Sequence, residues 1–496
     1  MDINYTLFSA VIIAFLVVNL GVGIWSTLKA RKSSVAADEQ FMLGGKSVPL
    51  VVIAMSYCAA AVSAGSFIGD PALAATMGWS YFWFPIFVTS GLCIPALFII
   101  RRLKLQADKF GVLTITDYIG ARFQSNAIKL YMAVVMAICY LFMLVSQFKG
   151  AAILFQMYTG VSFETGLILM MTVVVLLVVL GGLDSVAWSS FFQGFLMVFL
   201  ALVMVIGAFV AVGGVSRLDS ILSVDSPEIL QIVETGENAI IPWYAVPFIF
   251  LFTFFVMFSQ PYLSSRYLAM GNVNRKSVGK LLIITLTITG FFNMMITAGI
   301  TGRALFPEVL EGEMADYLTV TMSIELFPDI ITVLIMIGFF SAIISTAAAV
   351  LLTVAQCVGN DIYGRIKKDA SPKSKVIVIR VTVFVVAPLI TAFNFYKTPE
   401  FLQLFVLMSL TGVGAMLCMP LFAGVIWRNA TRAGAWCSAI LGPVSYLVMS
   451  QILEWSWAIS MGACVIPAAI GMFVVSWILN VVKGPDEVLQ KLYDVE

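Results

Sequence analysis

The sequence predicts an all-α membrane protein whose chain crosses the bilayer about thirteen times. Three observations lead to this prediction. The 496 residues are 61% hydrophobic and only 11% charged, and the mean hydropathy is +1.02. Apolar stretches of about 20 residues, which match a hydrocarbon core of about 30 Å, recur along the whole chain. Lysines and arginines gather in alternate gaps between these stretches, which is typical of cytoplasmic loops.

The apolar stretches give the candidate helices in order. They lie at residues 6–27, 48–77, 79–100, 128–158, 164–182, 186–213, 241–262, 279–303, 330–354, 376–395, 400–427, 433–453 and 459–482. The first stretch has no basic leader and no small-residue cleavage signature, so we expect a retained helix rather than a signal peptide. The loops are too short for a soluble domain. We therefore expect a single transmembrane domain over residues 1–496.

The basic residues also orient the chain. With the N-terminus outside and the C-terminus inside, nearly all of the 28 lysines and arginines fall on the inner side. Only Arg217, Arg303 and Lys397 fall outside, and Lys149 lies within a span. Adding or removing one helix after the first would disrupt this separation. The sequence contains no histidine, and it has no metal-ligand cluster, nucleophile elbow or phosphate loop, which argues against an enzyme.

Two spans are rich in small and hydroxylated residues, which find no hydrogen-bonding partner in lipid. The second span contains SYCAAAVSAGSFIGDPA and the ninth contains FFSAIISTAAA. A helix interrupted in the first of these stretches would free backbone carbonyls, which suit a hard cation such as Na⁺. The alternative for each stretch is close helix packing through small residues.

Six motifs in order make the chain resemble the sodium/solute symporter family along nearly its whole length. They are FMLGGKS, LTITDYIGARF, GNDIYGR, GVIWRNATRAGAWCSAILG, the interrupted second span, and SQPYLSSRYLA, in which Tyr262 replaces the family's usual histidine. The resemblance implies a LeuT-like core of two inverted five-helix repeats, at residues 48–213 and 241–427. It also implies one extra helix at 6–27 and two at 433–482.

The resemblance further implies one sodium site, formed by backbone carbonyls in the second and ninth spans and by two hydroxyls. Carried over residue by residue, its ligands are Ala59, Val62, Ala342, Ser345 and Thr346. Relatives with a second sodium ion use an aspartate in the sixth span and extra hydroxyls in the ninth. Ser190, Ala348 and Ala349 stand at those positions, so we expect a single coupling Na⁺.

Two charges lie inside predicted spans, where they are rare and costly. Lys149 is one turn before the position of the family's usual arginine, and Asp70 stands where relatives have glycine or an apolar residue. One hypothesis pairs Asp70 with Lys149. Two others remain open: Lys149 contacts a substrate carboxylate, or it extends to the headgroups.

Together these features predict a sodium-coupled symporter of a bacterial inner membrane that imports a small polar organic solute by alternating access and functions as a monomer. Organic acids of the pantothenate or monocarboxylate type come first as substrates, proline-like amino acids second and sugars third. A solute sensor and a passive channel are the rivals from other classes. Candidate substrate-binding residues surround the interruption and the facing spans: Tyr57, Ser63, Ser66, Gln147, Lys149 and Met257.

Overall fold

The computed structural model describes residues 5–30, 34–233, 241–310, 312–396 and 402–494, and every regular element within them is a helix. The first half comprises α1 (Tyr5–Ala30), α2 (Ala37–Leu43), α3 (Leu50–Ala61), α4 (Asp70–Met77), α5 (Trp83–Phe110), α6 (Ile115–Arg122), α7 (Asn126–Thr159), α8 (Phe163–Val212) and α9 (Val215–Asp225). Three charges used for orientation, Arg31, Lys32 and Lys397, lie outside the described residues.

The second half of the chain continues the pattern of long helices joined by short ones. It comprises α10 (Val246–Leu251), α11 (Pro261–Ala269), α12 (Arg275–Asn293), α13 (Met295–Leu305), α14 (Leu318–Leu326), α15 (Asp329–Gln356), α16 (Tyr363–Ile366), α17 (Pro372–Tyr396), α18 (Leu402–Ile426), α19 (Arg432–Leu447), α20 (Trp457–Ala463), α21 (Val465–Lys483) and α22 (Glu487–Tyr493).

Ten helical segments in the described part of the chain are long and apolar enough to cross a membrane, or up to twelve if each of two bent pairs is one span. The predicted windows at 164–182 and 186–213 form one 50-residue helix, α8. At 1.5 Å per residue it would be about 75 Å long if straight, more than twice the hydrocarbon thickness. It is not straight, because Gly182 has φ 57° and ψ −132° and divides it.

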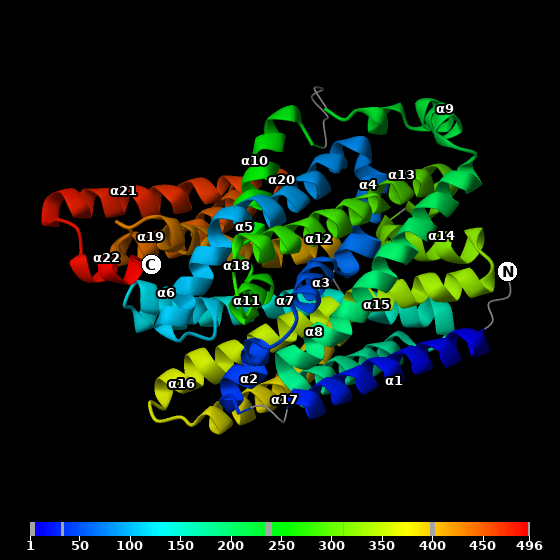
Figure 1. Ribbon diagram of the computed structural model, residues 1–496. Helices are drawn as coiled ribbons and strands as arrows, with labels where there is room; N and C mark the ends of the chain where they lie inside the picture. Colours follow the sequence, from blue (N-terminus) through cyan, green and yellow to red (C-terminus); the bar gives the residue numbers. More distant parts are fainter. Residues whose placement is uncertain (1–4, 31–33, 234–240, 311, 397–401, 495–496) are drawn as a thin grey trace.

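The long helices run roughly side by side along one direction (Figure 1). The start of α1, together with α9 and α14, lies at one end of this bundle, whereas α6, α16 and α22 lie at the other. The most apolar window of α15 is 78% buried, as is that of α18, so these two helices form the centre. The window of α1 is only 33% buried and that of α20–α21 is 28% buried, as expected for peripheral helices.

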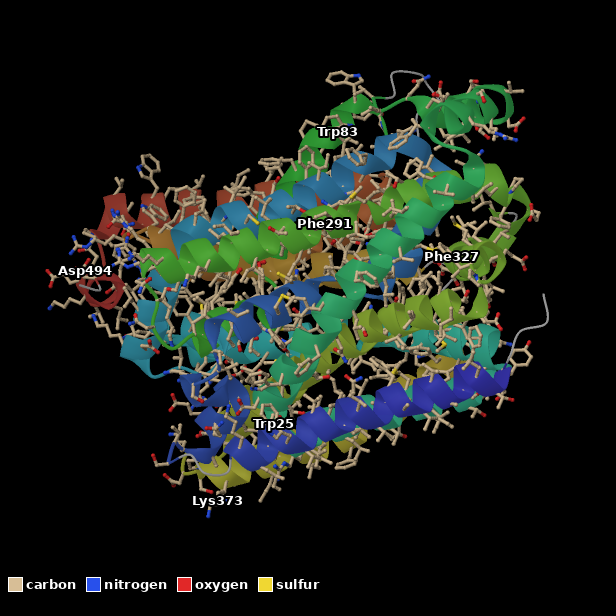
Figure 2. The ribbon with its side chains drawn as sticks, turned by 45° about the vertical axis from the view of Figure 1, so that its right-hand side comes forward. Trp25, Trp83, Phe291, Phe327, Lys373 and Asp494 are labelled. Carbon is tan, nitrogen blue, oxygen red and sulfur yellow. The ribbon has the colours of Figure 1, made fainter. Side chains whose placement is uncertain are left out.

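Large apolar side chains cover the outside of the bundle, including Trp25, Phe291 and Trp477, which are 48%, 41% and 63% exposed. Trp25 and Phe291 project from the ribbon in Figure 2. A water-soluble protein rarely exposes so much contiguous apolar surface, whereas a lipid-facing surface requires it. The outside of the described helices is therefore built to contact acyl chains.

Polar contacts hold the ends and the interfaces of the bundle. Asn19 of α1 accepts hydrogen bonds from Ser189 (2.8 Å) and Gln193 (2.6 Å) of α8. At the end near α6, Asp361 accepts hydrogen bonds from Thr114 (2.8 Å) and Thr116 (2.5 Å). These contacts join two motifs that are distant in the sequence, LTITDYIGARF and GNDIYGR.

Arg122, at the end of α6, is fully buried and binds three carbonyl groups. Its guanidinium donates to the oxygens of Gly424 (2.9 Å), Trp427 (3.3 Å) and Leu489 (3.0 Å). Gly424 belongs to the last turn of α18, where the free carbonyls carry partial negative charge and favour a cation. One side chain thus fixes α6, α18 and α22 to one another.

We expect Gly182→Ala to lower the stability of the protein by about 2–4 kcal/mol. The backbone there has a positive φ, and an added Cβ would lie 2.2 Å from the carbonyl oxygen of Phe41. The apparent melting temperature in detergent measures the effect. Gly290→Ala in α12 is the control, because nothing lies within 4 Å of its Cβ position. Equal melting temperatures for the two variants would contradict the role of the kink.

Candidate functional site

The second predicted span is interrupted in its middle. α3 ends at Ala61, and Val62 adopts an extended conformation with φ −93° and ψ 118°. The chain then re-enters a helix through a π-helical segment, Gly65–Gly69, that leads into α4. The last carbonyls of α3 therefore have no partner further along the helix. In the interior of a membrane protein, other groups must satisfy them.

Two adjacent hydroxyls of α15 satisfy these carbonyls. The Ser345 hydroxyl shares its one proton between the carbonyl oxygens of Ala59 (2.8 Å) and of Ala342 in its own helix (2.9 Å). The Thr346 hydroxyl likewise lies within donating distance of the carbonyl oxygens of Ala60 (3.0 Å) and Val62 (2.9 Å). The structure thus brings together all of the predicted ion ligands: Ala59, Val62, Ala342, Ser345 and Thr346.

The Ala60 carbonyl is a sixth oxygen in this cluster, and sequence reasoning missed it. All six oxygens are neutral and come from hydroxyls or backbone carbonyls, the ligands that a hard alkali cation prefers. Two of them, those of Ala59 and Ala60, belong to the last turn of α3, where the helix dipole adds partial negative charge. The residues present fit Na⁺, which would supply the positive charge between these oxygens.

The far side of the interruption carries backbone N–H groups, and the protein itself uses them. Ala64 N–H donates to Gln147 Oε1 (3.0 Å), and Gly65 N–H donates to the hydroxyl of Ser63 (3.1 Å). The Ser63 carbonyl accepts from the N–H groups of Ser66 (3.0 Å) and Phe67 (3.2 Å). Gln147, predicted as a substrate ligand, caps the broken helix instead.

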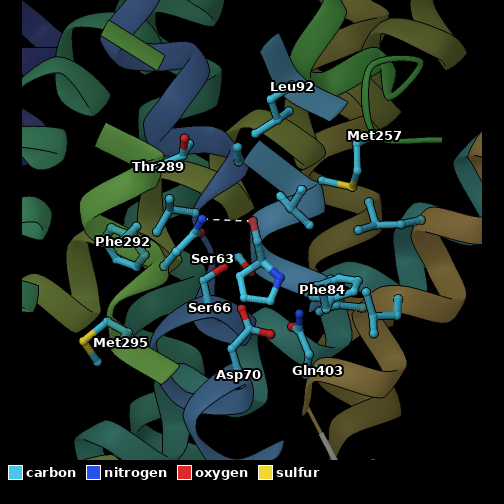
Figure 3. A pocket seen from close by; sticks show the side chains of 18 of the residues that line it. Ser63, Ser66, Asp70, Phe84, Leu92, Met257, Thr289, Phe292, Met295 and Gln403 are labelled. Atoms are coloured by element: carbon cyan, nitrogen blue, oxygen red, sulfur yellow. Dashed lines mark hydrogen bonds between the residues drawn. The ribbon is translucent and has the colours of Figure 1, made fainter. Parts of the chain in front are cut away.

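A small cavity of about 50 Å³ opens directly beside the interruption. Figure 3 shows Ser63, Ser66 and Asp70 on one side, with Gln403 of α18 beside Asp70. Apolar residues form most of the remaining lining: Phe84, Pro85, Val88, Leu92, Met143, Met257, Phe292, Met295, Ile296, Val406, Leu407 and Leu410.

Three of the six predicted substrate residues, Ser63, Ser66 and Met257, line this cavity. Tyr57 does not line it. Its hydroxyl donates to the carbonyl of Leu92 (3.3 Å) and accepts from the hydroxyl of Tyr267 (2.7 Å), so it supports the wall from behind. Gln147 and Lys149 are also absent from the lining. The residues that sequence reasoning missed, above all Gln403, lie on helices whose facing sides the sequence did not predict.

The structure does not pair Asp70 with Lys149, which was one of three hypotheses for Lys149. Lys149 Nζ lies 3.8 Å from Oδ2 of Asp316, in the segment before α14, and the two side chains are 11% and 2% exposed. Asp70 instead accepts a hydrogen bond of 2.6 Å from the hydroxyl of Tyr81. Lys149 has this partner because the segment between α13 and α14 brings Asp316 beside α7. The sequence shows this segment only as an acidic loop.

The chain is similar to known proteins over most of its length. A profile described as "Sodium:solute symporter family" matches residues 41–442. A sodium/pantothenate symporter of Escherichia coli is 25% identical over 445 residues, which are 89% of this chain and 90% of that protein. The high-affinity proline transporter of Bacillus subtilis is 27% identical over 423 residues, or 83% and 86% of the two chains.

Solved structures show the same fold. A Na⁺-coupled sialic acid symporter in a substrate-bound outward-open state gives a TM-score of 0.80 at 18% identity, covering 95% of this chain and 97% of its own. A closed nucleobase-cation-symport-1 family transporter gives 0.56 at 15% identity, covering 92% and 98%. The fold is therefore that of the LeuT-like symporters.

We expect a double-mutant cycle to show coupling between Lys149 and Asp316 of about 1 kcal/mol. Lys149→Met, Asp316→Asn and the double variant would be compared by apparent unfolding free energy, because removing either charge leaves the other buried and less well compensated. The matched cycle with Asp70→Asn should be additive within about 0.5 kcal/mol. Coupling between Lys149 and Asp70 of the same size would restore the rejected pair.

Proposed function

Because the chain belongs to the sodium:solute symporter family, we propose that it imports a small polar organic solute together with one Na⁺ per cycle. Transport proceeds by alternating access across a bacterial inner membrane. The observation that carries the proposal is the cluster of neutral oxygens between α3 and α15. In this cluster Ser345 and Thr346 bind the last carbonyls of an interrupted helix.

The proposed ion site and the solute cavity share one residue. Val62 contributes its carbonyl to the oxygen cluster, and it also lines the cavity together with its neighbour Ala61. A cation bound at the cluster would fix the end of α3 against α15. It would thereby fix one wall of the cavity. Such a shared element provides the differential contacts that coupling between two ligands requires.

A single coupling ion follows from the residues at the family's second sodium position. Ser190 of α8 and Ala348 and Ala349 of α15 are buried there and bring no carboxylate. One Na⁺ supplies about 2.3 kcal/mol from a potential of 100 mV and about 1.4 kcal/mol from a tenfold gradient. For a neutral solute this supports roughly 500-fold accumulation. A monoanion would retain only about tenfold, because its charge cancels the effect of the potential.

We propose thirteen crossings, with the N-terminus outside and the C-terminus inside. Two inverted repeats, residues 48–213 and 241–427, follow the extra helix 6–27 and precede two extra helices at 433–482. Two features support this arrangement. Gly182 divides α8 into two helices. The first span of each proposed repeat is interrupted. In the second repeat the interruption is a 45° bend between Met257 and Pro261. Interrupted spans at corresponding positions are typical of transporter repeats.

The preferred solute was an organic acid on sequence grounds, followed by an amino acid and a sugar. The cavity gives the organic acid no support, because no lysine or arginine occurs among the residues that line it. Lys149, the candidate partner for a carboxylate, lies instead beside Asp316. The protein is proposed to act as a monomer, since the cluster and the cavity are both formed within one chain.

The sodium site predicts that Ser345→Ala combined with Thr346→Val raises at least tenfold the Na⁺ concentration that gives half-maximal uptake or half-maximal thermal stabilisation. Two of the six oxygen ligands are then lost while the helix is kept. Proteoliposomes with an imposed sodium gradient, assayed with pantothenate, proline and galactose, would measure uptake, and the melting temperature against Na⁺ would measure binding. Thr353→Val is the matched control, since its hydroxyl bonds only within α15, to Ala349 (2.8 Å). Unchanged sodium dependence in the double variant would refute the site.

The topology predicts that a cysteine at Ser220 in α9 is labelled by an impermeant maleimide in intact cells. A cysteine at Ser371, before α17, should react only after the cells are opened. Both positions are exposed, and the seven native cysteines are all free and at least partly buried, so they give a low background. The reverse pattern would invert the proposed orientation, and labelling of both sites from outside would refute the number of crossings between them.

A further inference from the structure

Asp70 is a carboxylate in the wall of an otherwise apolar cavity. It is only 8% exposed and lies at the start of α4, near Ser66 and Gln403 (Figure 3). The 2.6 Å hydrogen bond from Tyr81 falls in the range for a hydroxyl that donates to an ionised carboxylate. A carboxylate in such surroundings needs a positive partner or a proton, since burying an unpaired charge is costly.

The described part of the protein does not supply that positive partner. Asp70 forms no ion pair with any described lysine or arginine, and Lys149 lies 3.8 Å from Asp316 instead. No basic residue lines the cavity. Gln403, which adjoins Asp70, adds a buried Oε1 acceptor that has no hydrogen-bond donor. This part of the wall therefore combines a carboxyl group that has no described cationic partner with an amide oxygen that has no donor.

The cavity also lacks the usual receptor for an anion. Broken helices of transporters bind anionic substrate groups with the free N–H groups of the half-helix N-terminus. Here the N–H groups of Ala64, Gly65, Ser66 and Phe67 already donate to Gln147 and Ser63. A solute carboxylate would have to displace these contacts. The interruption is thus closed to an anion, whereas Asp70 is open to a cation.

Two other polar groups of the lining, Asn293 and Thr289, also offer acceptors to a ligand. Asn293 donates both to the carbonyl of Pro85 (2.9 Å) and to the hydroxyl of Thr89 (2.8 Å), so its amide retains only the oxygen for a ligand. The Thr289 hydroxyl donates to the carbonyl of Thr285 (2.7 Å) and also retains acceptor capacity. Phe84 and Phe292 add aromatic rings, whose faces attract cations.

We propose that this cavity binds its solute through a cationic nitrogen, an ammonium or guanidinium group, which Asp70 holds with Gln403 beside it. The proposal rests on the proposed symport function and specifies its substrate class. The solute then has an amine rather than an acid as its recognised group, with an aliphatic body against the apolar lining. Import with one Na⁺ moves two positive charges inward. At 100 mV this raises the accumulation limit about 50-fold over that of a neutral solute.

The test uses four probes that differ in charge: butylammonium, agmatine, butyramide and butyrate. Purified full-length protein in nanodiscs is titrated with each probe in Na⁺ or K⁺ buffer, and the apparent melting temperature is recorded. At least one of the two cationic probes should raise it in the wild type, more strongly in Na⁺, whereas butyramide and butyrate should not. The proposal is overturned if neither cationic probe acts, or if butyrate does.

Variants then assign the effect to the carboxylate. Asp70→Asn should weaken binding of the active cationic probe at least tenfold, and Asp70→Glu, which keeps the charge, should retain most of it. Asp184→Asn is the matched control, because Asp184 is also a buried carboxylate but lies outside the cavity, where it accepts a hydrogen bond from Gln40 (2.5 Å). Equal binding by wild type and Asp70→Asn overturns the proposal.

Sodium alone separates this inference from the proposed function. Na⁺ should raise the melting temperature of the wild type and of Asp70→Asn equally, since its oxygen cluster does not include Asp70. If Asp70→Asn abolishes the Na⁺ effect, the carboxylate belongs to an ion site and the solute proposal fails. If Na⁺ has no effect on the wild type while a cationic probe does, the sodium proposal fails and the recognition of a cation stands.

Discussion

The need to satisfy backbone polar groups inside a membrane protein governs the centre of this molecule. The helix of the second span stops at Ala61 and resumes at Gly65, so carbonyls on one side and N–H groups on the other lose their helical partners. Lipid and apolar side chains offer no replacement. The hydroxyls of Ser345 and Thr346 serve the carbonyls, and Gln147 and Ser63 serve the N–H groups.

This division gives the two sides of the interruption different chemical properties. The carbonyl side retains neutral oxygens that suit an alkali cation, and its contacts come from a neighbouring helix, α15. The N–H groups on the other side already donate to the side chains of Gln147 and Ser63 and to the Ser63 carbonyl. The cavity beside the interruption therefore has oxygen acceptors in its wall, whereas these N–H groups of the broken helix are already bonded. Its one charged lining residue, Asp70, adds a further acceptor.

The sequence predicted the part of the site that depends on residue type. Ser345 and Thr346 stand out because hydroxyls are uncommon in an apolar helix, and the family resemblance links them to Ala59 and Val62. The carbonyl of Ala60 could not be identified in this way, because every residue has a carbonyl and only the backbone path selects one. Gln147 was identified as important, but an amide serves equally well as a cap or as a ligand.

The errors concern residues whose partners are set by long-range packing. One hypothesis paired Lys149 with Asp70 because both lie in the outer parts of adjacent spans, yet the segment before α14 places Asp316 beside Lys149. Thirteen apolar windows were predicted, and the described part of the chain has ten to twelve candidate spans. The break in α8 depends on the two dihedral angles of Gly182, which hydropathy does not indicate. Segments between spans, rather than the spans themselves, limited the prediction.

The contacts of Arg122 have a consequence for how the molecule changes shape. Because a single guanidinium holds carbonyls of α18, of the turn that follows it and of α22, these parts share one pivot with α6. Any rearrangement that opens this end of the bundle must carry them as one body or break several charge-assisted hydrogen bonds together. The short helix α22 is therefore tied to α6 and α18, and it must take part in any such rearrangement.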